Sequence, residues 1–140
     1  MTGQPLILIV DDNPDILFLL RTSLRAAGFD TEEALNGRIA LERIAGRKPD
    51  LVLLDLMMPI LDGWGVLEAL GSREDPPPVI VVSALEAKAS KDRAAKYSVA
   101  GYVTKPFNFK QLVNAVREVV ESTDLPERGE PGEPGDSAAV

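Results

Sequence analysis

The sequence predicts an α/β domain built on a doubly wound, five-stranded parallel sheet. Short continuous apolar runs alternate along the chain with amphipathic stretches. Such runs are typical of strands that are covered by helices on both faces. Because strand and helix alternate strictly, right-handed crossover connections lead to a parallel sheet with helices on both sides.

Three strands are predicted from apolar runs and two from mixed segments. The runs LILIV (6–10), LVLL (51–54) and VIVV (79–82) are rich in leucine and β-branched residues and show no period-2 alternation. We therefore expect them in the centre of the sheet. The segments FDTEEA (29–34) and GYVT (101–104) are more mixed in polarity, which suits positions toward the sheet edges.

Apolar residues at helical spacing predict the helices that follow the strands. The stretch EAKASKDRAAKY (86–97) is predicted to be helical from its Ala and Lys content, with only a thin buried stripe. The last helix has the clearest stripe and should end near Glu121. The stripes are Leu17, Leu20, Leu24 and Ala27; Leu41, Ile44 and Ala45; Val66, Leu67 and Leu70; and Phe109, Leu112, Val113, Val116, Val119 and Val120.

Composition limits the classes of function. A length of 140 residues suits one domain with a real core. The net charge is -7 and the Lys and Arg residues are scattered, which argues against binding to a nucleic-acid backbone or to an acidic surface. The absence of Cys and His removes thiolate, imidazole and the usual zinc chemistry. Carboxylates, hydroxyls and lysine remain, together with oxygen-ligated Mg²⁺.

The two ends of the chain suggest a cytoplasmic protein with a tail. The start MTGQPLILIV lacks a basic segment, and no apolar run approaches the roughly 18 residues of a membrane span. We expect a soluble, cytoplasmic domain at residues 5–121. Residues 122–140 are rich in Pro, Gly and acidic residues, so we expect a flexible tail or linker there.

Polar residues follow four of the predicted strands. Asp11 and Asp12 follow the first strand, Asp55 the third, Ser83 the fourth and Lys105 the fifth. The carboxyl ends of parallel strands lie at one edge of a sheet, where ligands bind. Singly, each residue has an ordinary alternative: Asp12 or Ser83 as a helix cap and Lys105 as a solvated loop charge. Their joint occurrence favours a site.

Three carboxylates at one edge call for a cation. They repel one another and raise each other's pKa unless a positive charge lies among them. With oxygen ligands alone, Mg²⁺ is the natural ion. The Asp55 carboxylate can then act as a nucleophile toward a phosphoryl group and form an aspartyl-phosphate, while a metal, an ammonium and a hydroxyl stabilise the transferring oxygens.

Four motifs resemble a known family. The segments VDDNP (10–14), LLDLMMPILDGW (53–64), VVSAL (81–85) and GYVTKPF (101–107) together resemble the receiver domain of two-component response regulators, similar to the chemotaxis response regulator. The resemblance covers about residues 5–121. It implies the flavodoxin-like (βα)5 fold with strand order 2-1-3-4-5.

The resemblance also implies a role for each site residue. Asp55 would accept a phosphoryl group, in a Mg²⁺-dependent reaction, from a sensor histidine kinase or histidine phosphotransfer protein. The chain would be a signalling domain and not an enzyme, apart from its own phosphorylation and dephosphorylation. The metal site would consist of Asp11, Asp12, Asp55 and the backbone carbonyl of Met57. The phosphoryl group would be bound by Ser83 and Lys105, and Tyr102 would swing inward on activation. The loop after Asp55 would be shaped by Pro59 and Gly63, and Pro106 would follow a cis peptide bond.

For Gly63 we expect a positive φ, which glycine tolerates best. For Tyr102 the ordinary alternative to a switch residue is a half-buried aromatic side chain on a strand. The face formed by the fourth helix, fifth strand and fifth helix would change on phosphorylation and signal to an unknown effector. Direct binding of nucleic acid or membrane by this chain is not expected.

The chain departs from the family pattern at several positions. Ser98 stands where receivers usually have glycine, and the fifth helix lacks the charge arrangement of receivers that dimerise in the winged-helix class. The resemblance also implies that Met57 and Leu85, two positions after the acceptor and two after the switch hydroxyl, lie at the mouth of the pocket. Both are apolar, which predicts a slowly lost phosphoryl group. Whether the domain stands alone or belongs to a longer regulator stays open.

Two other classes share parts of this pattern. Haloacid-dehalogenase-like phosphatases carry a second Asp two positions after the nucleophile, where this chain has Met57. Flavodoxin-like electron carriers need a hydroxyl- and glycine-rich loop after the first strand. The corresponding segment here, DDNPD, is acidic and would repel phosphate. Both classes are therefore disfavoured.

Overall fold

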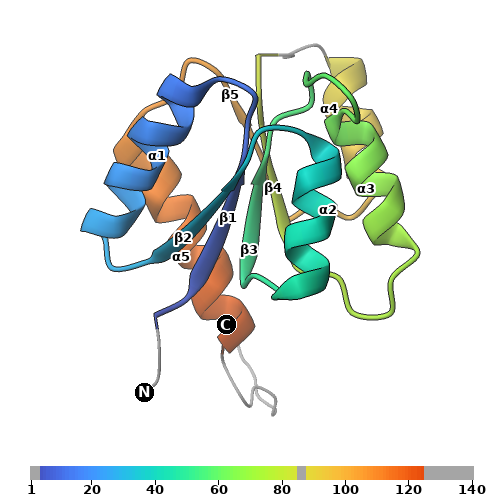
Figure 1. The fold of residues 1–140 in the computed structure, drawn as a ribbon. Coiled ribbons are helices and arrows are strands. Elements are labelled where there is room, and N and C mark those ends of the chain that lie inside the picture. The colour runs from blue at the N-terminus through green and yellow to red at the C-terminus, as the bar shows by residue number, and fades with distance from the viewer. Residues whose placement is uncertain (1–3, 85–87, 125–140) are drawn as a thin grey trace, which may run out of the picture.

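The computed structural model describes residues 4–84 and 88–124 and contains five strands and five helices in strict alternation (Figure 1). The strands at 6–10, 51–54 and 79–83 are rich in Val, Ile and Leu, and the helices bury apolar side chains against the sheet. The elements in chain order are β1 (Leu6–Val10), α1 (Pro14–Ala26), β2 (Asp30–Ala34), α2 (Gly37–Gly46), β3 (Leu51–Leu54), α3 (Gly63–Gly71), β4 (Val79–Ser83), α4 (Lys88–Ala95), β5 (Gly101–Thr104) and α5 (Phe109–Asp124).

The five strands form one sheet in the order β2-β1-β3-β4-β5, and every neighbouring pair is parallel. The predicted flavodoxin-like order is therefore confirmed. All residues of β1, β3 and β4 are buried, whereas β2 buries only Ala34 and β5 is half-buried throughout. The apolar runs thus lie in the centre and the mixed segments at the edges, as their polarity predicts.

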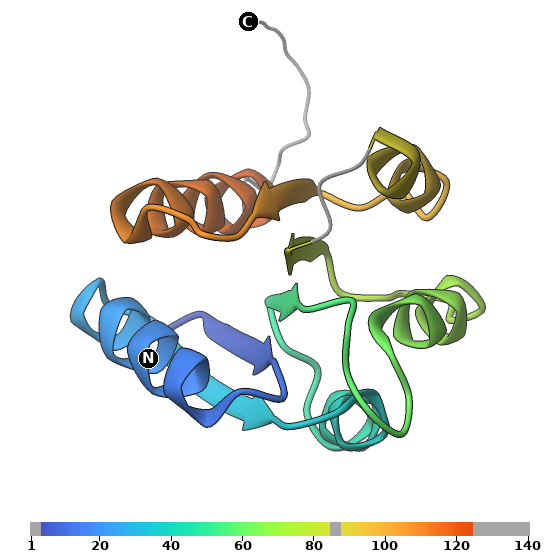
Figure 2. The same cartoon turned by 90° about the horizontal axis from the view of Figure 1, so that it is seen from above.

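Two hydrophobic cores lie on opposite faces of the sheet. Helices α1 and α5 cover one face, and α2, α3 and α4 cover the other (Figure 2). Because successive strand residues point to opposite faces, Ile7 and Ile9 belong to the first core while Leu8 and Val10 belong to the second. This sandwich fixes the strand ends on which the site is built.

The helices differ from the sequence prediction in three places. The stripe of α2 consists of Gly37, Ala40 and Ile44 with half-buried Leu41. Ala45 was predicted on this stripe and is exposed, because it lies 100° around the helix from Ile44. Helix α5 continues to Asp124, three residues beyond the predicted end, since no proline or glycine interrupts residues 122–124.

The predicted fourth helix is the third difference. The described helix α4 begins at Lys88 and ends at Ala95, and residues 86 and 87 of the predicted range lie outside the described residues. Ala94 is its buried residue, which confirms the thin stripe.

Within the described residues, no helix is both long and apolar enough to cross a membrane.

Candidate functional site

The site lies at the carboxyl ends of β1, β3, β4 and β5. Asp11 follows β1 and is 3 % exposed, and Asp55 follows β3 and is 5 % exposed. Their backbone N–H groups continue the sheet ladder, with Asp11 donating to Ala34 and Asp55 donating to Val10. Both carboxylates are therefore carried by rigid, buried backbone and not by loops.

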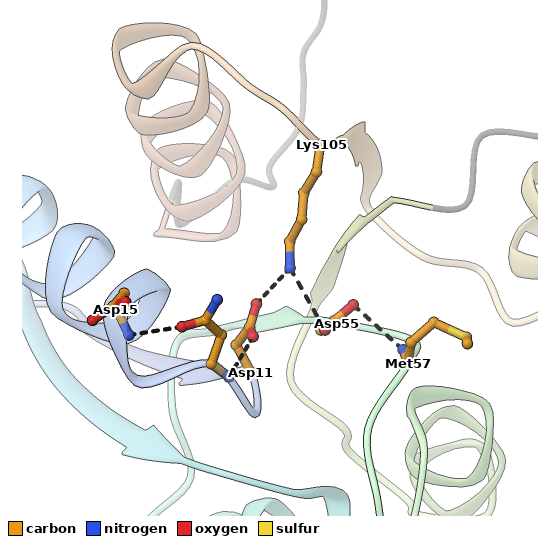
Figure 3. Close-up of polar contacts among 6 residues, drawn as sticks. Asp11, Asp15, Asp55, Met57 and Lys105 are labelled. Carbon is orange, nitrogen blue, oxygen red and sulfur yellow. Dashed lines mark hydrogen bonds and ion pairs between the residues drawn. The ribbon is translucent and has the colours of Figure 1, made fainter.

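Lys105 reaches these carboxylates from the end of β5. Its backbone N–H donates to the carbonyl of Ser83 at 2.8 Å, and the peptide bond to Pro106 is cis. Its Nζ lies 2.7 Å from Oδ2 of Asp11 and 3.6 Å from Oδ2 of Asp55 (Figure 3). One ammonium group thus joins the ends of β1, β3 and β5.

Both oxygens of Asp11 have donors. Oδ2 accepts from Lys105, and Oδ1 accepts from the backbone N–H of Asn13 at 2.9 Å. Asn13 in turn caps α1, because its side chain accepts from the N–H of Asp15 (Figure 3). The alternative prediction that Asp12 caps this helix is therefore wrong, and Asp12 is exposed.

Burial and charge set the protonation of the site. Burial raises the pKa of Asp55 above its usual value, and the nearby Asp11 carboxylate adds to this rise. The Lys105 ammonium and the N–H of Met57, 3.3 Å from Oδ1 of Asp55, oppose it. The pKa of Lys105 is raised: burial alone would lower it, but its bonds to Asp11 and its proximity to Asp55 more than compensate.

The three aspartates form a group that could hold a metal ion. One carboxylate oxygen from each of Asp11, Asp12 and Asp55 lies within 4.8 Å of the other two. All three donors are hard oxygens, which fit a cation such as Mg²⁺. Lys105 already compensates part of the negative charge of Asp11 and Asp55. A metal ion would therefore have to neutralise only the remaining charge. Asp12 is the exposed member of the group, whereas Asp11 and Asp55 are buried.

The loop after Asp55 depends on close backbone contacts at Gly63. A Cβ atom at this position would lie 2.5 Å from the carbonyl oxygen of Asp55 and 2.7 Å from Cα of Leu56. The expected positive φ at Gly63 is wrong, because Gly28 is the glycine of the described residues with that conformation. Glycine is required at position 63 because the start of α3 lies against the end of β3.

The positive φ falls instead on Ile60, at +71°. The N–H of Leu61 donates to the carbonyl of Pro59 at 2.8 Å, so residues 59–61 form a γ-turn of the rare kind with positive φ at its centre. The carbonyl of Leu61 accepts from the N–H of Gly37, 2.9 Å away, and a Cβ on Gly37 would lie 2.4 Å from that oxygen. The start of α2 therefore supports the loop.

The remaining predicted residues surround the acid cluster. Ser83 is fully buried at the end of β4, one strand from Asp55. Tyr102 is half-buried on β5, and burial raises its pKa. Met57 is 60 % exposed, whereas Leu85 lies outside the described residues. Ser98 has a φ of +59°, in the left-handed region that favours glycine.

Sequence reasoning missed Asn13, Gly37 and Ile60. Asn13 before Pro14 is a common signal for a helix start. Asn36, just before Gly37, is another, and its side chain caps α2 by accepting from the N–H of Ile39. No local signal marks Ile60, since a β-branched residue is a poor candidate for positive φ. Its conformation follows from the geometry of the loop as a whole.

The comparison with known families agrees with this geometry. The model of the response regulator receiver domain matches residues 7–117. The chain belongs to this family. The receiver domain of the Francisella response regulator 1452 superposes with a TM-score of 0.82 and 33 % identity, covering 86 % of this chain and 99 % of that domain.

Curated relatives of this receiver are longer regulators. The transcriptional regulatory protein PrrA of Mycobacterium leprae is 34 % identical over 118 residues, which is 84 % of this chain and 51 % of PrrA. The response regulator MprA of Mycolicibacterium vanbaalenii is 37 % identical over 134 residues, which is 96 % of this chain and 56 % of MprA. The chain thus spans about half the length of the curated relatives that it matches.

Proposed function

We propose that this receiver accepts a phosphoryl group on Asp55 from a histidine kinase or histidine phosphotransfer protein and signals through a change of conformation. The main support is the bridge of Lys105 between Asp11 and Asp55, with Nζ distances of 2.7 and 3.6 Å. This bridge places an ammonium beside a buried carboxylate nucleophile. The remaining residues of the site supply what phosphoryl transfer requires.

In the proposed reaction, a carboxylate oxygen of Asp55 attacks phosphorus and the bond from phosphorus to the donor nitrogen breaks. The electron pair of that bond stays on the imidazole of the donor, so Asp55 becomes an acyl phosphate and the histidine is regenerated. Asp55 must be ionised to attack. Lys105 lowers its pKa toward that state, against the effects of burial and Asp11.

Asp12, Asp55 and the Met57 carbonyl would hold Mg²⁺, with Asp11 orienting a bound water. The grouping of three carboxylates within 4.8 Å supports this assignment. When bound, the ion would neutralise charge on the transferring oxygens. Lys105 would pair with the phosphoryl group, and the hydrogen bond from its backbone N–H to the Ser83 carbonyl supports this placement.

The proposed switch begins at Ser83. A phosphoryl group adds about 1.5 to 2 negative charges and strong acceptors, which would attract the Ser83 hydroxyl and Lys105. Tyr102, half-buried on the neighbouring strand, would then move inward and change the face formed by α4, β5 and α5. That face would contact a downstream effector.

A phosphotransfer panel tests this function. Autophosphorylated sensor kinases of the source organism are mixed with the wild type and with Asp55→Asn in Mg²⁺. We expect at least one kinase to transfer its phosphoryl group to the wild type within minutes and none to transfer it to the variant. Equal labelling of both proteins, or no labelling of the wild type by any kinase or small phosphodonor, would overturn the proposal.

A further inference from the structure

Helix α4 is attached to the domain by little apolar surface. Ala94 is its buried residue, whereas α1 buries Leu17, Leu20 and Leu24. An amphipathic helix is normally held by the burial of an apolar stripe. Other contacts must therefore contribute to the position of α4.

Arg93 joins α4 to α3. Its guanidinium carbon lies 4.1 Å from the centroid of the Trp64 ring, well within the range of a cation–π interaction. Trp64 is half-buried, packs against the core beneath α3, and has its ring centroid 6.4 Å from that of Tyr97. The guanidinium thus lies over a ring that also packs against the core.

Lys91 joins α4 to β5. Its Nζ lies 5.8 Å from the centroid of the Tyr102 ring. Lys91 and Arg93 are two residues apart, which is about 200° around a helix, so they leave α4 on opposite flanks. One cation therefore reaches α3, and the other reaches the tyrosine that is proposed to move.

We propose that Arg93 and Lys91 are positioning residues that tether α4 to Trp64 and Tyr102 and thereby oppose the rearrangement that follows phosphorylation of Asp55. The tether itself depends only on the contacts described above. Its effect on phosphorylation rests on the proposed function. The two statements are tested separately.

The tether is tested by amide exchange without any phosphoryl analogue. Arg93→Gln and Lys91→Gln should each exchange the amides of residues 88–95 about fivefold faster, the change that about 1 kcal/mol makes in an opening equilibrium. Gln has a helix propensity close to that of Arg and Lys. Arg93→Lys should restore slow exchange, because it keeps a cation.

The matched control is Lys96→Gln. Lys96 is exposed just beyond the end of α4, and the described residues show no ring contact for it, so this variant removes the same charge without a tether. Trp64 is the chain's one tryptophan, and acrylamide quenching of its fluorescence should rise in Arg93→Gln alone. Unchanged exchange and quenching in Arg93→Gln, or equal changes in Lys96→Gln, would overturn the tether.

The effect on the site is tested by titrating beryllofluoride in saturating Mg²⁺. Loss of the tether should raise the apparent affinity of Arg93→Gln and Lys91→Gln about fivefold, whereas loss of a positive charge by itself lowers affinity for an anionic ligand. Loss of the tether and loss of charge would therefore change the beryllofluoride affinity in opposite directions. Faster exchange with unchanged or lower affinity would overturn the opposing role. If the wild type binds no beryllofluoride, the proposed function fails, while the exchange experiment still decides the tether.

Discussion

The ammonium of Lys105 lies closer to Asp11 than to Asp55, at 2.7 Å against 3.6 Å. Asp11 is almost fully buried, and its other oxygen accepts from Asn13. Lys105 is thus anchored on a neighbour of the proposed phosphoacceptor, within reach of a group added to Asp55. The same lysine has a structural role, because it compensates two buried carboxylates.

Removal of this ammonium should destabilise the fold. Lys105→Met leaves Asp11 and Asp55 buried without their cation, which should lower the free energy of unfolding at pH 7 by about 2 kcal/mol. The variant is compared with Lys110→Met, at an exposed position, by urea denaturation. Equal midpoints for the two variants would contradict the structural role of Lys105.

The pH dependence of that role follows from the raised pKa of Lys105. Since the pKa rises above 10.5 in the folded state, the stabilisation is complete below 10.5 and is lost as pH rises through the folded value. The difference in stability between wild type and Lys105→Met should therefore be constant from pH 7 to 9 and shrink above 10.5. A difference that disappears between pH 7 and 9 would count against this assignment.

Asp55→Asn should stabilise the unphosphorylated protein at pH 7. The folded-state pKa of Asp55 is raised above 3.8, so its contribution to stability is present below 3.8 and is lost as pH rises through the folded value. The neutral amide of the variant does not ionise, so this loss of stability at higher pH does not occur. Denaturation at pH 7 should show a higher midpoint for the variant, and the gain should shrink below pH 3.8. The exposed Glu68→Gln is the control, and an equal gain there would point to net charge as the cause.

Ile60→Asn should stabilise the loop after Asp55. Ile60 has a φ of +71°, which is strained for a β-branched residue and tolerable for asparagine. We expect a gain of about 1 kcal/mol in the free energy of unfolding. Leu35→Asn removes an exposed leucine outside the positive-φ residues. A gain of the same size there would show that lost surface hydrophobicity, and not backbone strain, is responsible.

Gly63→Ala should destabilise the domain and disturb Asp55. The new Cβ would lie 2.5 Å from the Asp55 carbonyl oxygen, so β3 and α3 must separate at a cost of about 2 kcal/mol. Gly71→Ala, at the other end of the same helix, has no atom within 4 Å of its Cβ. Thermal unfolding of the two variants should differ clearly, and similar melting temperatures would contradict the close contact.

Much of the fold was predictable from local patterns. The buried runs of β1, β3 and β4 lack alternation because both faces of the sheet are covered, and this signal is contained within each segment. The convergence of Asp11, Asp55 and Lys105 followed from the rule that parallel strands end at one edge. The family motifs added the strand order.

The missed features depend on contacts between distant segments. The contact of Gly63 with Asp55 and that of Gly37 with Leu61 are set by how helices pack on strand ends. That the Lys105 ammonium lies closer to Asp11 than to Asp55 depends on a contact between residues 94 positions apart. Arg93 and Lys91 are ordinary exposed residues in the sequence, and only the packing of α4 beside Trp64 and Tyr102 distinguishes them.

Intact mass spectrometry after incubation with acetyl phosphate and Mg²⁺ tests the central claim most directly. The wild type should gain a single phosphoryl group that peptide mapping places on Asp55, because Asp11, the other aspartate that is buried within residues 4–84 and 88–124, already accepts hydrogen bonds from Lys105 and Asn13. Asp55→Asn should gain none, since an amide is not a nucleophile, and chelation of Mg²⁺ should abolish the gain in the wild type. A phosphoryl group retained by Asp55→Asn, or one mapped to Asp11 or Asp12 in the wild type, would contradict Asp55 as the acceptor.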